Sequence, residues 1–331
     1  GSAKSALSGP AGMKMWGPYE WQAPYYWYSE EAKGNAVGFN TEIGIGAQIP
    51  VYESLVKMIP EDQLWPVGDA YDFHCTTSRD ALHDLNELKT VIEKRHGGAS
   101  DLEDFLRKAH FIDYEGTRAM IEAHRVNVPR STGVIQWMLN SAWPSLYWQM
   151  YDWYLVPVSS YWSVKKGCAP QQLIYNYGDK HVYAVNDEKE DMDLKAFMTV
   201  YGLDGNILSD AKCDVEMAAG SSIKVFETPE LDKIGFVFLR LEDAKGNVVS
   251  RNEYCLAEIM DKHNWEKYRW WRTQIESYAD FTTALQRETR DVLRDRPTKA
   301  DEAYFTGKLV FVGDEKRAIT AEEANSIRAY L

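Results

Sequence analysis

The first 165 residues combine short apolar runs with longer segments in which apolar residues recur every three or four positions. The run that ends at Glu42 is β-prone, and Val134 to Leu139 is a short apolar run typical of a strand buried on both faces. Helical spacing predicts helices that begin near Pro50, Asp80, Ser100 and Leu146, the last of them running from 146 to 155. Strand, helix, helix, strand, helix is the order of an α/β barrel.

Proline, glycine and capping residues indicate where the predicted helices begin and end. Pro50 suits the first turn of a helix, and Gly97 with Gly98 stops the helix that begins near Asp80. Ser100 to Glu103 reads as a capping box, because the serine can accept from a backbone amide while the glutamate reaches back. Residues 1–30 carry Gly-Pro pairs and many aromatics, which predicts a loop.

After about Lys165 the apolar period changes to two, which is typical of strands. Hairpin turns are expected at Gly178-Asp179, Asp204-Gly205 and Lys245-Gly246. Short strands with turn signals at this spacing predict an immunoglobulin-like sandwich. A linker or new domain follows from Asp261, and beyond residue 284 only Lys308 to Val312 looks like a strand.

Two runs carry candidate chemistry. Gly38-Phe-Asn-Thr-Glu-Ile-Gly44 places Glu42 on a strand between glycines, and Gly133 to Pro144 is rich in tryptophan and amide side chains. A barrel strand that delivers a carboxylate to a sugar-cleaving site has this form, although a surface glutamate in a turn has it too. The second run contributes Trp137, Asn140 and Trp143.

The two runs together resemble the C-terminal part of the catalytic barrel of glycoside hydrolase family 2, in its exo-β-D-glucosaminidase (exo-chitosanase) branch, with β-mannosidases as near relatives. The matching segments are 12–19, 38–50, 105–115, 131–154 and 250–254. The resemblance implies an α/β plus all-β chain, in which the C-terminal part of a TIM (β/α)8 barrel precedes an immunoglobulin-like β-sandwich. The expected domains are residues 1–165, the sandwich over 166–262, and an unassigned linker and further domain over 263–331.

Retaining glycosidases use two carboxyl groups about 5–5.5 Å apart, one as nucleophile and one as general acid/base. By motif position Glu42 matches the family's nucleophile, at the end of barrel strand seven. The acid/base belongs to strand four, which we expect to lie outside this sequence. Substrate-binding roles are expected for five residues: Asn40, Trp137, Asn140, Trp143 and Tyr19. For Trp137 the alternative is a place in the barrel core.

The composition of the chain limits the kinds of molecule that it is expected to bind. The formal charge of −13 argues against nucleic acid and suits a cationic sugar polymer, although solubility alone explains an acidic surface. The 12 tryptophans and 20 tyrosines suit both sugar platforms and core packing. The four cysteines lack metal-binding spacing; Cys213 and Cys255 are able to pair across a sandwich, but free thiols are expected. Neither a metal nor another cofactor is expected, and no apolar run is long enough for a membrane span.

The leading interpretation is part of a retaining exo-acting glycosidase that removes β-linked glucosamine from chitosan oligosaccharides. We expect the chain alone to be inactive and to leave large apolar side chains exposed, because its partner is the remaining N-terminal part of the enzyme. Gly1-Ser2 looks like a cloning remnant, and family resemblance suggests a secreted or periplasmic protein. The alternatives are a β-mannosidase and a non-catalytic carbohydrate-binding or scaffold fragment.

Overall fold

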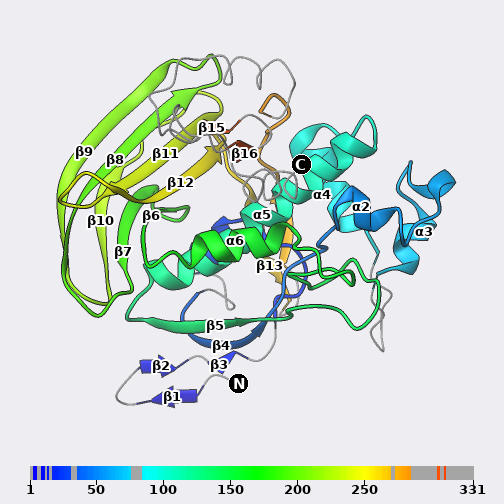
Figure 1. Ribbon diagram of the computed structural model, residues 1–331, viewed down its shortest axis with the longest axis horizontal. Helices are drawn as coiled ribbons and strands as arrows, with labels where there is room; N and C mark the ends of the chain where they lie inside the picture. Colours follow the sequence, from blue (N-terminus) through cyan, green and yellow to red (C-terminus); the bar gives the residue numbers. More distant parts are fainter. Residues whose placement is uncertain are drawn as a thin grey trace.

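The computed structural model describes residues 3–5, 9–11, 13–14, 17–30, 36–75, 84–269, 273–284, 304–305 and 309–310. The 25-residue helix α5 (Leu102–Val126) runs through the middle of the molecule, with a small parallel sheet on one side and an antiparallel sandwich on the other (Figure 1). The described part is mostly β-sheet with an immunoglobulin-like domain.

The parallel sheet has the strand order β3 (Met13–Lys14), β4 (Gly38–Ile43) and β5 (Ser131–Gln136). The prediction that residues 1–30 form a loop was wrong in part. They contain β3, the hairpin of β1 (Ala3–Ser5) and β2 (Gly9–Ala11), and the short helix α1 (Tyr25–Tyr28). Strands of two or three residues are too short to give an alternating pattern.

The helices between β4 and β5 are shorter than expected except for the last. They are α2 (Tyr52–Leu55), the 3₁₀ turn η1 (Glu61–Gln63), α3 (Asp69–Phe73), α4 (Asn86–His96) and α5. The predicted helix start near Asp80 lies outside the described residues. Gly97 ends α4 with a φ of 71°, as the glycine pair predicted.

Helix α5 begins one residue later than the predicted capping box. Its N-cap is Asp101, whose carboxylate accepts from the backbone amide of Asp104 at 2.8 Å. The Asp104 carboxylate reaches back to the amide of Ser100 at 3.1 Å. Nearly every residue from Phe105 to Val126 is buried, because the helix has partners on both sides.

The predicted helix from 146 to 155 is wrong. Trp148 and Leu155 have φ angles of 53° and 61°, which a right-handed helix excludes. The buried Asp152 carboxylate instead accepts from the amides of Tyr154 and Val156, at 2.8 and 2.9 Å, and so shapes a turn. The next helix is α6 (Ser159–Gly167).

One face of the parallel sheet is open. The second strand, predicted to be buried on both faces within a barrel, has Ile135 52% exposed in this chain. Phe39 on the neighbouring strand is 38% exposed and lies against Gly133, where a Cβ would come within 2.8 Å of the Phe39 ring. The expectation of large apolar side chains facing water is therefore confirmed at these positions.

Seven antiparallel strands form the sandwich, in two sheets of order β10-β7-β6 and β12-β11-β8-β9. The strands are β6 (Gln171–Asn176), β7 (His181–Asn186), β8 (Met192–Gly202), β9 (Ile207–Met217), β10 (Ser221–Glu227), β11 (Gly235–Glu242) and β12 (Val248–Leu256). All three predicted hairpin turns are confirmed, because they lie between paired strands. Inward-facing residues of both sheets, among them Val182, Met198 and Leu239, share one core with α5.

After the sandwich, β13 (Lys262–Tyr268) pairs with β14 (Thr273–Ser277), and β15 (Tyr304–Phe305) pairs with β16 (Leu309–Val310). The last strand falls within the predicted 308–312 run. All four cysteines are free thiols, so Cys213 and Cys255 do not pair.

Candidate active site

Glu42 is the next-to-last residue of β4, where the parallel strand ends. The residue after β5 is hydrogen-bonded to the end of β4, since the Trp137 amide donates to the Ile43 carbonyl at 2.6 Å. Only glycine fits at position 44, since a Cβ there would lie 2.0 Å from the Trp137 carbonyl oxygen. The glycine after the glutamate therefore lets the two strand ends come together and brings Trp137 beside β4.

Tyr19 is the hydrogen-bond partner of the candidate nucleophile. Its hydroxyl donates to Oε1 of Glu42, although the two residues are 23 positions apart. Burial raises the pKa of the Tyr19 phenol, and the hydrogen bond to Glu42 and the negative charge of its carboxylate raise it further. The phenol therefore stays protonated at neutral pH, as a donor that holds the Glu42 carboxylate in one orientation.

Trp148 holds Tyr19 in turn. Its indole Nε1 donates to the Tyr19 carbonyl at 2.7 Å, and the two rings meet edge to face with centroids 5.8 Å apart. The Trp148 carbonyl accepts from the Met138 amide at 3.0 Å, which ties the loop after β5 back to the strand end. Sequence reasoning missed this role, because the expected helix over 146–155 hid the position of the tryptophan.

Asn40 does not lie where strand alternation predicted. Alternate residues of a regular strand face the same way, so Asn40 was expected beside Glu42. The pairing of β4 with β5 is irregular between Asn40 and Ile43, and the fully buried Asn40 amide lies 2.8 Å from Nε2 of His124 on α5. His124 continues to the Ser131 hydroxyl at 2.6 Å. Asn40 therefore joins the strand to the helix behind it.

Trp137, Asn140 and Trp143 lie in the loop that follows β5. Trp137 is 43% exposed in the described structure. Asn140 is exposed and bonds weakly to the Ser141 carbonyl, at 3.3 Å. Trp143 stacks on His74 with centroids 5.9 Å apart and an interplanar angle of 18°. The structure thus brings Tyr19, Glu42 and Trp137 together, and places the other two farther along the same loop.

A buried polar network joins the segment after β4 and the segment after β5 to helix α5. Gln48, after β4, donates to Asp113 at 3.2 Å, and Gln149, after β5, donates to the Gln48 carbonyl at 3.2 Å. Asp113 also accepts from the hydroxyls of Thr117 and Ser159. Burial raises the pKa of Asp113 to about 6, while these hydrogen bonds limit the rise. Helix α5 thus fixes the backbone on which the site stands.

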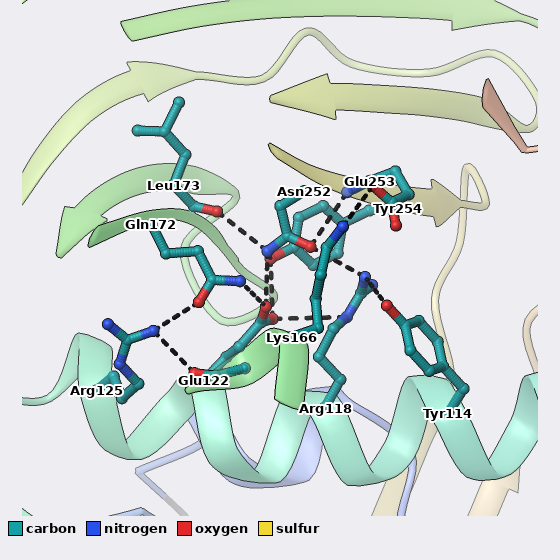
Figure 2. Close-up of polar contacts among 11 residues, drawn as sticks. Tyr114, Arg118, Glu122, Arg125, Lys166, Gln172, Leu173, Asn252, Glu253 and Tyr254 are labelled. Carbon is teal, nitrogen blue, oxygen red and sulfur yellow. Dashed lines mark hydrogen bonds and ion pairs between the residues drawn. The ribbon is translucent and has the colours of Figure 1, made fainter. Parts of the chain in front are cut away.

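The same helix is joined to the sandwich by buried charges (Figure 2). Glu122 is completely buried and accepts from Asn252 at 2.6 Å and from the Tyr254 hydroxyl at 2.8 Å, both on β12. Arg118, one turn earlier, donates to the Asn252 oxygen at 3.1 Å and lies over the Tyr254 ring at 4.3 Å. These contacts attach the immunoglobulin-like domain to the helix behind the site.

Among the described residues there is no group of three or more histidine, cysteine or acidic side chains placed to hold a metal ion. Within the same ranges no helix has the length and apolar character that crossing a membrane requires.

Comparison with known proteins gives a consistent picture. Residues 178–259 match the family model of the Mannosidase Ig/CBM-like domain. The exo-β-D-glucosaminidase of Hypocrea jecorina is 33% identical over 339 residues, which cover 98% of this chain and 37% of that protein. The crystal structure of the exo-chitosanase of Amycolatopsis orientalis superposes with a TM-score of 0.78 at 32% identity, covering 85% of this chain and 35% of that one.

A more distant relative is the mannosylglycoprotein endo-β-mannosidase of Lilium longiflorum, 24% identical over 268 residues, which cover 72% of this chain and 27% of that protein. The chain thus spans between about a quarter and little more than a third of the length of these relatives.

Proposed function

Because the chain is homologous to exo-β-D-glucosaminidases over most of its length, we propose that it forms part of a retaining exo-acting glycoside hydrolase that removes β-linked glucosamine from chitosan oligosaccharides. Glu42 is the nucleophile in this proposal. The observation that carries it is the position of the Glu42 carboxylate at the C-terminal end of a parallel strand, with a protonated Tyr19 donating to it. Active sites of α/β barrels lie at that end of the strands.

The hydrogen bond from Tyr19 suits a nucleophile. An ionised carboxylate attacks the anomeric carbon, and a neutral donor keeps one of its oxygens oriented without neutralising the charge. The second carboxyl group, the general acid/base, comes in our proposal from a barrel strand outside the 331 residues. Residues 1–165 are then the C-terminal part of a (β/α)8 barrel, 166–262 the sandwich, and 263–331 the beginning of a further region.

The open face of the parallel sheet supports the proposal that further barrel strands cover it in the whole enzyme. Phe39 and Ile135 project from neighbouring strands on the face away from α5, and both are more than a third exposed. In a closed barrel such side chains fill the interior. We therefore propose the remaining N-terminal part of the enzyme as the partner that covers them.

Trp137 is the proposed floor of the sugar subsite, since its exposed ring follows the strand end beside Glu42. Asn140 and Trp143, exposed in the same loop, are proposed to contact the sugar. Tyr19 acts on Glu42, and Asn40 is left out of the subsite because it faces His124. The negative charge of the chain favours a cationic amino sugar over a neutral one.

The test is made in the enzyme that contains these residues together with the strands that precede them. Glu42→Gln should lower kcat on p-nitrophenyl β-D-glucosaminide by several orders of magnitude while the melting temperature stays nearly unchanged. The matched control is Glu53→Gln, at an exposed position of α2, which should leave kcat unchanged. A 2-deoxy-2-fluoro glycoside should label Glu42; labelling of another residue would contradict the assignment.

The sugar specificity has its own test. Attraction between an acidic protein and a cationic substrate weakens with salt, so kcat/KM on chitosan oligosaccharides should fall as ionic strength rises. A higher kcat/KM on p-nitrophenyl β-D-mannoside than on the glucosaminide would favour the second candidate, a β-mannosidase, which the lily relative keeps open. Turnover by the 331 residues alone, abolished by Glu42→Gln, would show that the acid/base lies inside the chain.

A further inference from the structure

A pocket lies between the sandwich and the β13–β14 hairpin. Its volume is about 720 Å³, within the range of ligand-binding sites. Its walls come from the turn after β6, the loop after β10, the end of β12 and the hairpin itself. The pocket shares no residue with the contacts around Glu42, so the proposed reaction leaves it unexplained.

His263 is the unusual member of the pocket wall. It is only 2% exposed, yet neither ring nitrogen has a hydrogen-bond partner within the described part of the chain. Burial lowers the pKa of His263 to about 3, so the ring is neutral and offers one donor and one acceptor. A buried polar group without a partner costs free energy that a ligand hydroxyl would recover.

An aromatic surface adjoins this histidine. Trp265 stacks on His263 with centroids 5.0 Å apart and an interplanar angle of 29°, and its side chain is partly exposed. Tyr25 on α1 lines the same pocket. Partly exposed indole and phenol rings offer apolar faces to the C–H groups of a sugar ring, while their polar edges stay wet.

The pocket is acidic. Five carboxyl groups and two lysines line it: Glu230, Glu258, Asp261, Glu266, Glu276, Lys180 and Lys262. Both lysines already pair, Lys180 with Glu230 at 3.0 Å and Lys262 with Glu276 at 3.5 Å. Glu258 and Glu266 are exposed and have no ion pair among the described residues. Two carboxylates with no ion-pair partner among the described residues favour a cationic ligand over a neutral one.

We propose that this pocket is a second carbohydrate-binding site, which holds a glucosamine-containing oligosaccharide with a sugar ring on Trp265, a hydroxyl group on His263 and ammonium groups on Glu258 and Glu266. The choice of an amino sugar rests on the proposed function, whereas the existence of the site rests on the pocket alone. The site would keep a chitosan chain on the protein while Glu42 acts on a chain end.

Binding by the 331-residue chain tests the proposal without turnover. Isothermal titration with the hexamer of β-1,4-linked glucosamine should show binding that Glu258→Gln with Glu266→Gln weakens tenfold or more. The matched control, Glu188→Gln with Glu190→Gln, makes the same charge change in the exposed turn after β7 and should leave the affinity unchanged. Equal affinity of the Glu258/Glu266 variant and the wild type would overturn the proposal.

His263→Phe separates a binding role from a structural one. Phenylalanine keeps the ring stack on Trp265 and removes both unpartnered nitrogens, so affinity should fall while the melting temperature stays equal or rises. A fall in melting temperature with unchanged affinity would overturn the role of His263. If the hexamer of N-acetylglucosamine binds as well as the glucosamine hexamer, the amino-sugar assignment is wrong.

Kinetics distinguish failure here from failure of the proposed function. In the whole enzyme the pocket variants should leave kcat/KM on p-nitrophenyl β-D-glucosaminide unchanged and lower it on the polymer. An unchanged value on the polymer would overturn the proposal even if Glu42 is confirmed. A whole enzyme without activity on the glucosaminide would sink the proposed function, and hexamer binding that depends on Glu258 and Glu266 would still support the pocket.

Discussion

Replacing Glu122 with glutamine tests how strongly the sandwich is fastened to α5. The glutamine has the same length and keeps an oxygen that can accept from Asn252 and Gln172, the donors now 2.6 and 3.1 Å from Oε1. What it removes is the negative charge 3.8 Å from the Arg118 guanidinium, in a place where both side chains are at most 4% exposed. Breaking a buried pair by removing one partner costs about 3–5 kcal/mol, because the other charge is left without compensation.

Removing the other member of the pair, Arg118, should cost less free energy of unfolding. Burial raises the pKa of the Glu122 carboxyl, with Arg118 opposing the rise, so when Arg118 is lost the carboxylate can bind a proton and become neutral. The Arg118 guanidinium has no such escape, since it does not deprotonate in proteins. Arg118→Met should therefore cost about 1–3 kcal/mol at pH 7, mainly for the lost hydrogen bond to Asn252. That loss should shrink toward pH 5, where protonation of Glu122 is easier.

Urea unfolding followed by tryptophan fluorescence at pH 7 and pH 5 measures both variants and their combination. The double variant should lose less free energy of unfolding than the sum of the single variants, because no uncompensated charge remains. Equal losses for Arg118→Met and Glu122→Gln at both pH values would contradict the expected asymmetry between the two charges. Losses that simply add in the double variant would contradict the coupling between them.

Three further outcomes are expected. Asp113 has a folded pKa of about 6, above its ordinary value of 3.8, so the stability of the folded protein is highest below pH 3.8 and falls as pH rises through 6. The difference in free energy of unfolding between the wild type and Asp113→Asn should therefore fall by about 2.4 kcal/mol between pH 4 and pH 7, as measured by urea titration. Gly44→Ala should destabilise the chain by about 1–3 kcal/mol or more because of the clash with the Trp137 carbonyl, whereas Gly68→Ala, whose Cβ would be 3.9 Å from its nearest neighbour, should change the melting temperature little. Ile135→Ser should lower the free energy of unfolding by less than about 1 kcal/mol in the chain alone, where the residue is half exposed. In the whole enzyme the loss should be clearly larger, because other barrel strands are proposed to cover this residue. Equal losses in the two proteins would speak against a completed barrel.

The parts of the fold that the sequence predicted well are those set by neighbouring residues. The turn at Asp204-Gly205 needs only two adjacent residues that tolerate positive φ, and Gly205 has a φ of 76°. The glycine that ends α4 is a local signal of the same kind. The run 146–155 failed because a single buried carboxylate, Asp152, shapes the backbone there, and an aromatic-rich run at helical spacing does not show this.

In the candidate site, too, the sequence predicted what neighbouring residues determine and missed what contacts between distant residues determine. Glu42 and its flanking glycines form one short run, which sequence reasoning can recognise. The donor to Glu42 is 23 residues away, and the partner of Asn40, His124, is 84 residues away. The strand pairing is irregular between Asn40 and Ile43, and no residue pattern within the strand marks this irregularity. Trp148 joins the arrangement only through its contact with Tyr19, which depends on the tertiary fold.

The burial of α5 on both sides affects how this protein can be divided for experiments. The segment that matches the immunoglobulin-like family model begins at residue 178, in the turn between β6 and its pairing partner β7, and so leaves β6 out. A recombinant sandwich cut at that boundary would lack one sheet edge. It would also expose Asn252 and Tyr254, whose hydrogen-bond acceptor Glu122 belongs to α5. The boundary of the family match therefore divides contacts that the sandwich shares with α5, and a fragment that keeps these contacts has to begin before Leu102.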